Sequence, residues 1–418
     1  MPMLTRTRAI LATTLVVAAL ASVAVLSKDT PSAKPEDVGM SSERLARMDK
    51  FIHGYVDAGR TPGVVTLIAR HGKVVHVDAY GKADLASGRA TRADDIFRMY
   101  SMTKPITSVA LLSLYEEGRF QLTDPLSKYF PAFAGIKVMT GTSPSGGMLL
   151  DSPRRPITVQ DIFRHTAGFS YGFGGSPVDK MYQDANVFAT DLDGLVAKVG
   201  KMPLLYQPGE RWVYSVAHDV QAALVEKLSG QKFDQFVQQR VFTPLGMRDS
   251  VFKIPADKKS RVPGLYSMDK GKLVADTSPL GTGYGDQVFG GFSISTTASD
   301  YALFAQMLLN KGQLNGVRLL SPKTVELMAT NHLPPPARAS GPSPGTGYGL
   351  GVSVTMDPAA RGNLGSVGEF GWSGAASTHV LIDPKEDLVA IYCTQLMGGD
   401  FAIRAEFATL LYQSIVGN

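Results

Sequence analysis

The feature that most restricts the fold of this chain is a pair of apolar hairpin patterns near its opposite ends. GVVTLIAR and VVHVDAYG flank a tight HGK turn near the start, and THVLID and LVAIYCTQ flank PKED near the end. Runs rich in β-branched residues around turn residues are typical of β-hairpins. A helical pattern, SSERLARMDKFIHGYVDAG, precedes the first hairpin, and another, IRAEFATLLYQSIV (403–416), follows the second. We therefore expect the chain ends to build one antiparallel sheet with helices packed against it.

The middle of the chain has a different pattern. The segments TVQDIFRHT, DLDGLVAKV, AHDVQAALVEKL and FDQFVQQRVF have helical periodicity and are separated by Gly/Pro-rich loops. These patterns predict an α+β fold, with a sheet domain from residues 36–119 and 285–418 and an inserted, mostly helical domain from residues 120–284. The Pro/Gly-rich stretch 331–347 is expected to be a surface loop.

The first 26 residues have the pattern of an export signal. Two arginines precede an apolar run from Ala9 to Leu26, which contains the small-x-small sequence Ala19-Leu20-Ala21. We predict an exported protein, periplasmic or secreted. Membrane contact is expected only if this segment stays uncleaved, because the apolar run is about as long as a short membrane span.

Composition argues against several classes of function. The single cysteine, Cys393, excludes an internal disulfide framework and a multi-cysteine metal site. The net charge of +5 is not gathered into basic runs, so no nucleic-acid partner is expected. The histidines lack ligand spacing and no glycine cluster has a phosphate-loop context, so we predict no metal or cofactor. A neutral small molecule is the expected substrate.

The motif S-x-x-K occurs four times, and its context separates one match from the others. The motifs at Ser229, Ser250 and Ser267 lie at a helix end, in a strand-like run and in a turn-like run. Only Ser101-Met102-Thr103-Lys104 opens a helical pattern, and there the i, i+3 spacing puts serine and lysine on one face. A hydroxyl at a helix N-terminus lies near the positive end of the dipole, and a desolvated lysine can accept a proton. The alternative is that Ser101 only caps the helix beside a solvated Lys104.

Two further segments carry candidate site residues. Tyr214, Ser215 and Val216 lie in a loop before an amphipathic helix, where a tyrosine could share a proton with Ser101 and Lys104. The run Trp372-Ser373-Gly374-Ala375 stands ahead of a strand pattern. Its small residues would let a substrate approach the backbone and leave the N–H of Ala375 as an oxyanion donor.

Taken together, SMTK, YSV and WSG resemble the S-x-x-K, Y-x-N and K-T-G elements of class C β-lactamases and penicillin-binding proteins, and most closely the family VIII carboxylesterases. The resemblance covers about residues 36–416. It implies a nucleophile at Ser101 with Lys104 as its partner, Tyr214 as the general base, and an oxyanion hole from the N–H groups of Ser101 and Ala375.

Two departures from the lactamase pattern bear on the substrate. Val216 stands where a lactamase has Asn, and Trp372 where it has Lys or His. The loss of an amide donor and a cation removes reasons to bind an anionic lactam. We therefore expect Val216, Trp372, Ser373 and Gly374 to contact a short-chain acyl ester. A β-lactamase or D-peptidase, an acyltransferase and a noncatalytic penicillin-binding-like module remain as alternatives.

A competing motif lies at Gly168-Phe169-Ser170-Tyr171-Gly172, which matches the G-x-S-x-G nucleophile elbow, with His379 downstream in the order that its triad needs. An elbow requires a strand before the serine and a helix directly after it. Here a helical pattern precedes the motif and a loop follows it. We therefore predict that Ser170 is a turn residue.

Overall fold

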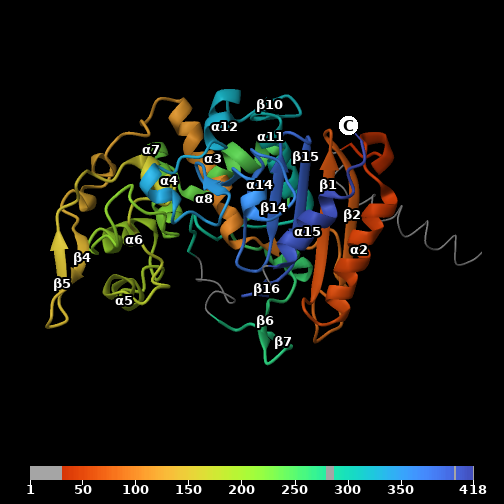
Figure 1. Cartoon of the computed structure of the whole chain (residues 1–418), viewed down its shortest axis with the longest axis horizontal. Coiled ribbons are helices and arrows are strands. Elements are labelled where there is room, and N and C mark those ends of the chain that lie inside the picture. Colours follow the sequence, from red (N-terminus) through yellow and green to blue (C-terminus); the bar gives the residue numbers. More distant parts are fainter. Residues whose placement is uncertain (1–30, 279–286, 400–401, 418) are drawn as a thin grey trace, which may run out of the picture.

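A computed structural model describes residues 31–278, 287–399 and 402–417 (Figure 1). The predicted export segment, residues 1–26, and the predicted domain boundary at 284/285 lie outside these ranges. The division of the chain into two domains therefore stays a prediction.

Strands from both ends of the described chain form a seven-stranded sheet with the order β11-β12-β13-β14-β15-β1-β2, and all neighbours in it are antiparallel. The strand bounds are β1 Gly63–Arg70, β2 Lys73–Gly81, β11 Thr346–Tyr348, β12 Ser353–Thr355, β13 Phe370–Ser373, β14 His379–Asp383 and β15 Leu388–Cys393. The pairing of β1 with β15 joins the first hairpin to the second. Both predicted hairpins and the single antiparallel sheet are confirmed.

Helices cover both faces of this sheet because the apolar side chains of its central strands alternate between two cores. On β1, Val64 and Ile68 pack with helices α2 (Ser42–Asp57) and α15 (Ala402–Tyr412). The alternate residues of β1 face the opposite core, which includes helix α11 (Ala298–Leu309). This arrangement explains why every residue of β1 is buried.

One buried arginine joins the two ends of the described chain. The guanidinium of Arg70, at the end of β1, donates from Nη1 to the carbonyl oxygens of Val38 (2.8 Å) and Gly417 (2.7 Å). It also forms an ion pair with Glu386 in the turn after β14. The residues before α2 and those after α15 are thus held side by side (Figure 1).

The other described helices gather mainly on one side of the sheet (Figure 1). Their bounds are α3 Thr103–Glu116, α4 Val159–Phe163, α5 Pro177–Asp184, α6 Leu192–Val199, α7 Ala217–Ser229, α8 Phe233–Val237, α9 Thr243–Leu245, α12 Pro322–Met328, α13 Pro335–Arg338 and α14 Pro358–Arg361. Helix α3 is buried along most of its length and packs against α7. A π-helical turn over Gln238–Phe242 follows α8 within the predicted helix FDQFVQQRVF.

Short strands complete the description, and they pair with one another outside the seven-stranded sheet. They are β3 Phe97–Arg98 with β8 Ser295–Thr296, β4 Val138–Thr142 with β5 Met148–Asp151, β9 Gln313–Leu314 with β10 Val317–Arg318, and β6 Tyr266–Asp269 between β7 Lys272–Ala275 and β16 Leu396–Met397. Short 3-10 helices cover Pro35–Val38, Tyr100–Met102, Leu126–Lys128, Pro131–Phe133 and Ala256–Arg261. The whole is an α+β fold, as the sequence predicts.

Candidate active site

Ser101 lies in the 3-10 turn that leads directly into α3. The backbone of this turn is held on both sides. The N–H of Met99 donates to the carbonyl of Ile294 (2.9 Å), and the hydroxyl of Tyr301 donates to the carbonyl of Met102 (2.8 Å). Tyr100 has a φ of +46°, in the left-handed region that non-glycine residues rarely adopt. A strained residue fixed by its surroundings before a functional group is typical of a preorganised site.

The structure brings the three residues of the predicted catalytic set together at one oxygen atom. Oη of Tyr214 donates to Oγ of Ser101 at 2.6 Å, and Nζ of Lys104 donates to the same Oγ at 3.1 Å. Ser101 comes from the 3-10 turn before α3, Lys104 from the first turn of α3, and Tyr214 from the loop before α7. The close packing of α3 against α7 therefore sets the distances within the site.

Lys104 is fully buried, and polar groups surround its amine. Nζ also donates to the carbonyl of Gly291 (2.9 Å), and the N–H of Gly291 donates to Oδ1 of Asp219 (2.8 Å). Burial raises the pKa of Asp219 to about 7, although the positive charge of Lys104 and the hydrogen bond from Gly291 act against this rise. The site thus holds a buried lysine and a buried carboxyl group on either side of one glycine.

Tyr214 is surrounded by aromatic side chains. Its ring lies 4.8 Å from His165, 5.3 Å from Tyr171 and 5.7 Å from Trp372, measured between ring centroids. Burial, aided by the charge of Lys104, holds the pKa of His165 well below its usual value, so this imidazole is neutral. Nζ of Lys104 lies 4.6 Å from the centroid of the Tyr214 ring. Lys104 and Arg404 are both positive charges close enough to act on Tyr214.

A cavity of about 750 Å³ opens onto Ser101 and Tyr214. Trp372 and Ser373, at the end of β13, and Gly374 and Ala375, in the turn that follows, all line it. The sequence pattern predicts that this run stands directly ahead of a strand. Its first half is instead the end of β13, and the next strand, β14, begins at His379. Trp372 therefore forms part of the cavity wall.

The turn after β13 lies directly against the turn of Ser101. Oγ1 of Thr378 donates to the carbonyl of Met99 at 3.3 Å. A Cβ at Gly374 would collide with this same carbonyl and with Oγ1 of Thr378, so only glycine fits here. The close approach of these two backbones brings Ser101 and Ala375 to the same cavity.

The structure corrects the prediction for Val216. Its side chain is fully buried in the hydrophobic core at the start of α7 and does not line the cavity. Helix α7 begins at Ala217 with Val216 as its N-cap residue, and the side chain of Val216 faces the core. In this conformation Val216 cannot contact a substrate in the cavity, although the sequence predicts that it does.

The competing motif does not form a nucleophile elbow. Ser170 lies in a loop between α4 and α5, with no strand before it, and is only 2% exposed. Its hydroxyl donates to Asp179, and its oxygen accepts from the N–H of Gly172. His379 instead pairs with Ser373, with Nδ1 and Oγ 2.8 Å apart. Ser170 thus lies in a loop that lacks the strand and helix of a nucleophile elbow.

Sequence reasoning missed much of the cavity wall. Residues that line it without being predicted are Trp212, Pro342, Ser343, Thr346, Ser353, Thr355, Arg361, Asn363, His379, Arg404 and Ala405. The stretch 331–347, expected to be only a surface loop, thus contributes to the site and contains helix α13. Two arginines, Arg361 and Arg404, are part of this wall. Trp212 and His379 stand close in the sequence to the predicted residues Tyr214 and Ala375, whereas most of the others come from distant segments that meet only in the fold.

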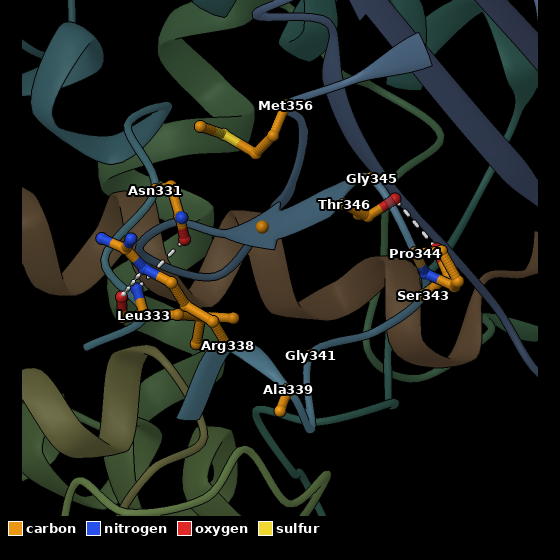
Figure 2. Close-up of a pocket in the computed structure, with 11 residues that line it drawn as sticks. Asn331, Leu333, Arg338, Ala339, Gly341, Ser343, Pro344, Gly345, Thr346 and Met356 are labelled. Carbon is orange, nitrogen blue, oxygen red and sulfur yellow. Dashed lines mark hydrogen bonds between the residues drawn. The ribbon is translucent and has the colours of Figure 1, made fainter. Parts of the chain in front are cut away.

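A second cavity, of about 540 Å³, adjoins the first and shares Ser343 and Thr346 with it. The hydroxyl of Ser343 donates to Oγ1 of Thr346 (2.9 Å), and Figure 2 shows this pair apart from Asn331, Leu333 and Arg338 on the other side of the cavity. There, Oδ1 of Asn331 accepts from the N–H of Leu333, and Nε of Arg338 donates to the carbonyl of Leu333. The Ser343–Thr346 pair therefore borders both cavities.

Two further findings concern the described residues only. Among them, no group of three or more histidine, cysteine, aspartate or glutamate side chains could hold a metal ion, and no helix has the length and apolarity needed to cross a membrane. Cys393 is buried in β15, and burial raises the pKa of its thiol.

Comparisons with known proteins place this geometry in context. The Beta-lactamase family model matches residues 48–413. The chain is 35% identical to Protein Rv1367c of Mycobacterium tuberculosis (81% of this chain, 87% of that one) and 31% identical to Lovastatin esterase of Penicillium rubens (83% and 92%). The solved structure of EstCE1, described as a hydrolase with promiscuous acyltransferase activity, has a TM-score of 0.75 at 23% identity and covers 90% of this chain and 99% of its own.

Proposed function

The chain belongs to the Beta-lactamase family, and on this premise we propose that it is a serine carboxylesterase that cleaves acyl esters through an acyl-enzyme on Ser101. The family resemblance stated from SMTK, YSV and WSG is confirmed, and with it the β-lactamase-like fold. Membership and the named relatives support a serine hydrolase, and the esterase activity is our proposal. The observation that carries it is the meeting of Tyr214 and Lys104 at Oγ of Ser101, at the edge of a cavity.

In the proposed acylation step, the hydroxyl proton of Ser101 passes to Tyr214 in its phenolate form while Oγ bonds to the acyl carbon. The π pair of the carbonyl moves onto its oxygen, and the N–H groups of Ser101 and Ala375 stabilise the oxyanion. The carbonyl then re-forms, the bond to the alcohol breaks, and Tyr214 returns the proton to the leaving oxygen. The nearby charge of Lys104 stabilises the phenolate.

Deacylation repeats these steps with water as the nucleophile. Water gives a proton to the phenolate of Tyr214 and its oxygen adds to the acyl carbon. Collapse of the second tetrahedral species releases Oγ of Ser101, which takes the proton back from Tyr214. The products are the free acid and the regenerated site, so no cofactor is required.

The cavity wall supports an ester as substrate. Trp372 offers an aromatic surface where a lactamase has a cation. The relative with 31% identity is named as an esterase of lovastatin. The cavity of about 750 Å³ has room for a short acyl chain together with a larger alcohol. Because Arg361 and Arg404 also line it, the tested substrates should include a carboxylate-bearing ester beside a neutral one.

The test is hydrolysis of p-nitrophenyl butyrate and of a chromogenic cephalosporin by the wild-type protein and by Ser101→Ala. We expect ester turnover that is lost in the variant, and cephalosporin turnover at least about 100-fold slower than ester turnover. A faster cephalosporin reaction would favour the β-lactamase alternative. Failure of the wild type to turn over either substrate or to form a Ser101 adduct with a fluorophosphonate would favour the noncatalytic module.

An acyltransferase is the second candidate function, because the structural neighbour EstCE1 is described as having promiscuous activity of that kind. Here an alcohol would replace water in the second half of the reaction. Addition of a primary alcohol to the butyrate assay distinguishes the two candidates. Formation of a butyrate ester of that alcohol at a rate above hydrolysis would favour the transferase, and release of butyric acid alone would favour the esterase.

Export remains part of the proposal on the strength of residues 1–26. The mass of the intact protein recovered from the periplasm or medium tests it. A mass lacking this segment would support cleavage and release, and the full mass in a membrane fraction would support an anchor.

A further inference from the structure

The most informative residue outside the Ser101 centre is Arg404, in the first turn of α15. Its guanidinium lines the cavity and donates from Nη2 to the carbonyl oxygen of Gly374 at 3.3 Å. Helix α15 is far from Ser101 in the sequence and docks on the sheet through Phe407 and Leu411. This contact therefore links the C-terminal helix to the turn after β13.

The carbonyl of Gly374 and the N–H of Ala375 belong to the same planar peptide unit. A donor on the oxygen of a peptide withdraws electron density and makes the N–H of that peptide a stronger donor. Because the donor here is charged, the effect is larger than that of a neutral hydrogen bond. The contact of Arg404 thus acts on the group that our proposed function assigns to the oxyanion hole.

The surrounding bonds hold this peptide in one orientation. The N–H of Ser377 donates to the same oxygen of Gly374 (3.1 Å), and the N–H of Gly374 donates to the carbonyl of Thr378 (2.8 Å). Gly374 packs against the carbonyl of Met99 with no room for a side chain. Because these bonds already fix the orientation of the Gly374–Ala375 peptide, the main contribution of Arg404 to it is electrostatic.

We propose that Arg404 is a positioning residue of the oxyanion hole, which orients and polarises the Gly374–Ala375 peptide from behind without touching the reacting atoms. The inference rests on the proposed function, since it needs an oxyanion at the N–H of Ala375. It assigns α15 a role in the reaction. It also differs from a direct contact between Arg404 and an anionic substrate group, because it acts equally on a neutral ester.

The test compares Arg404→Met with the wild type on neutral p-nitrophenyl butyrate. We expect kcat to fall roughly 10- to 100-fold, which is no more than the fall expected when one oxyanion-hole donor is removed entirely. KM should stay within about threefold of the wild-type value. The affinity for a butyl trifluoromethyl ketone, whose serine adduct carries an oxyanion, should fall by the same factor as kcat. Arg404→Lys, which keeps the charge, should lose less of both.

Arg44→Met is the matched control. Arg44, on α2, also donates from its guanidinium to a backbone carbonyl next to α15, that of Gln413 (2.8 Å), and it does not line the cavity. The control reports any effect of looser docking of α15, and we expect its kcat to match the wild type. The melting temperature of each variant is measured alongside.

Three results would overturn the inference while the proposed function stands. In each, the wild type hydrolyses the ester and forms the Ser101 adduct. The results are an unchanged kcat in Arg404→Met, an equal fall of kcat in Arg44→Met, and a loss confined to the KM of a carboxylate-bearing ester. If Arg404→Met does not fold, Arg404→Lys decides: kcat and ketone affinity falling together support the inference, and no change in either refutes it.

Discussion

Ser101 and Ser170 lie in two regions that look alike in sequence and differ in chemistry. Each serine belongs to a nucleophile-like motif, precedes a helix in the chain, and makes hydrogen bonds to side-chain or backbone groups. Ser101 meets an amine and a phenol, groups that can hold a charge and exchange a proton, at the edge of a cavity. The hydroxyl of Ser170 donates to the carboxylate of Asp179, which also accepts a hydrogen bond from Ser176 in the capping box of α5. The groups around Ser101 can take part in proton transfer, whereas those around Ser170 stabilise the N-terminus of α5.

The carboxyl groups of the two regions sharpen the contrast. Burial alone would raise the pKa of Asp179, but hydrogen bonds from Ser170 and Ser176 outweigh it and lower that pKa below its usual value. Burial raises the pKa of Asp219, beside Lys104, to about 7. A carboxylate satisfied by donors is a structural element, whereas a buried carboxyl near neutrality is typical of a functional site. The difference lies in the partners, which neither motif specifies.

The largest expected effect separates the two serines directly. Ser101→Ala should lower kcat/KM for p-nitrophenyl butyrate by at least about 10³-fold, because the nucleophile is lost. Ser170→Ala should stay within about threefold of the wild type. The measurement is initial rates on purified, folded protein. Equal losses in the two variants would break the comparison.

Tyr214→Phe should lower kcat by about 10²- to 10³-fold, because it removes the group that moves the proton of Ser101. The matched control is Tyr182→Phe, a buried tyrosine of α5 in the region of Ser170. It should leave kcat within about threefold. Retention of most activity in Tyr214→Phe would require Lys104 to be the proton acceptor.

Asp219→Asn tests the raised pKa. Since the folded-state pKa is higher than the unfolded value of 3.8, the native state retains a proton that the unfolded state loses, and stability falls as the pH rises from about 4 to about 7. This loss amounts to up to about 4 kcal/mol and should be absent in Asp219→Asn. Denaturant unfolding of both proteins between pH 4 and pH 8 measures it. Identical pH dependences would show that Asp219 ionises normally.

The smallest effect concerns the structural serine. Ser170→Ala leaves the carboxylate of Asp179 without one donor, and we expect a loss of roughly 1–3 kcal/mol in the free energy of unfolding at pH 7. Because the pKa of Asp179 is lowered, its contribution is present above its unfolded pKa and disappears as the pH falls through the folded value. The deficit of the variant should therefore shrink in acid, which urea unfolding at pH 7 and at a series of pH values below 4 would detect.

Local pattern was sufficient to predict the sheet, its flanking helices and the placement of Ser101 and Lys104 at a helix start. The catalytic set of Ser101, Lys104 and Tyr214 followed from the family resemblance of the three short motifs. It failed for Val216, because one turn of backbone decides whether a residue after Tyr214 faces the cavity or the core. It could not find Arg404 or Ser343, because their relation to Ser101 arises only when separate segments meet. The N-terminal segment 1–26 stays a prediction.

The buried guanidinium of Arg70, which holds the carbonyls of Val38 and Gly417, has a topological consequence. The backbones of Gly39 and Val416 are already hydrogen-bonded to each other, so a short linker would be enough to turn the described chain into a ring. New chain termini could then be introduced in the exposed turn between β4 and β5, near Ser145. This hairpin lies far from the C-terminal end in Figure 1. In such a circular permutant the termini would lie in the β4–β5 turn, and no chain end would lie beside the seven-stranded sheet.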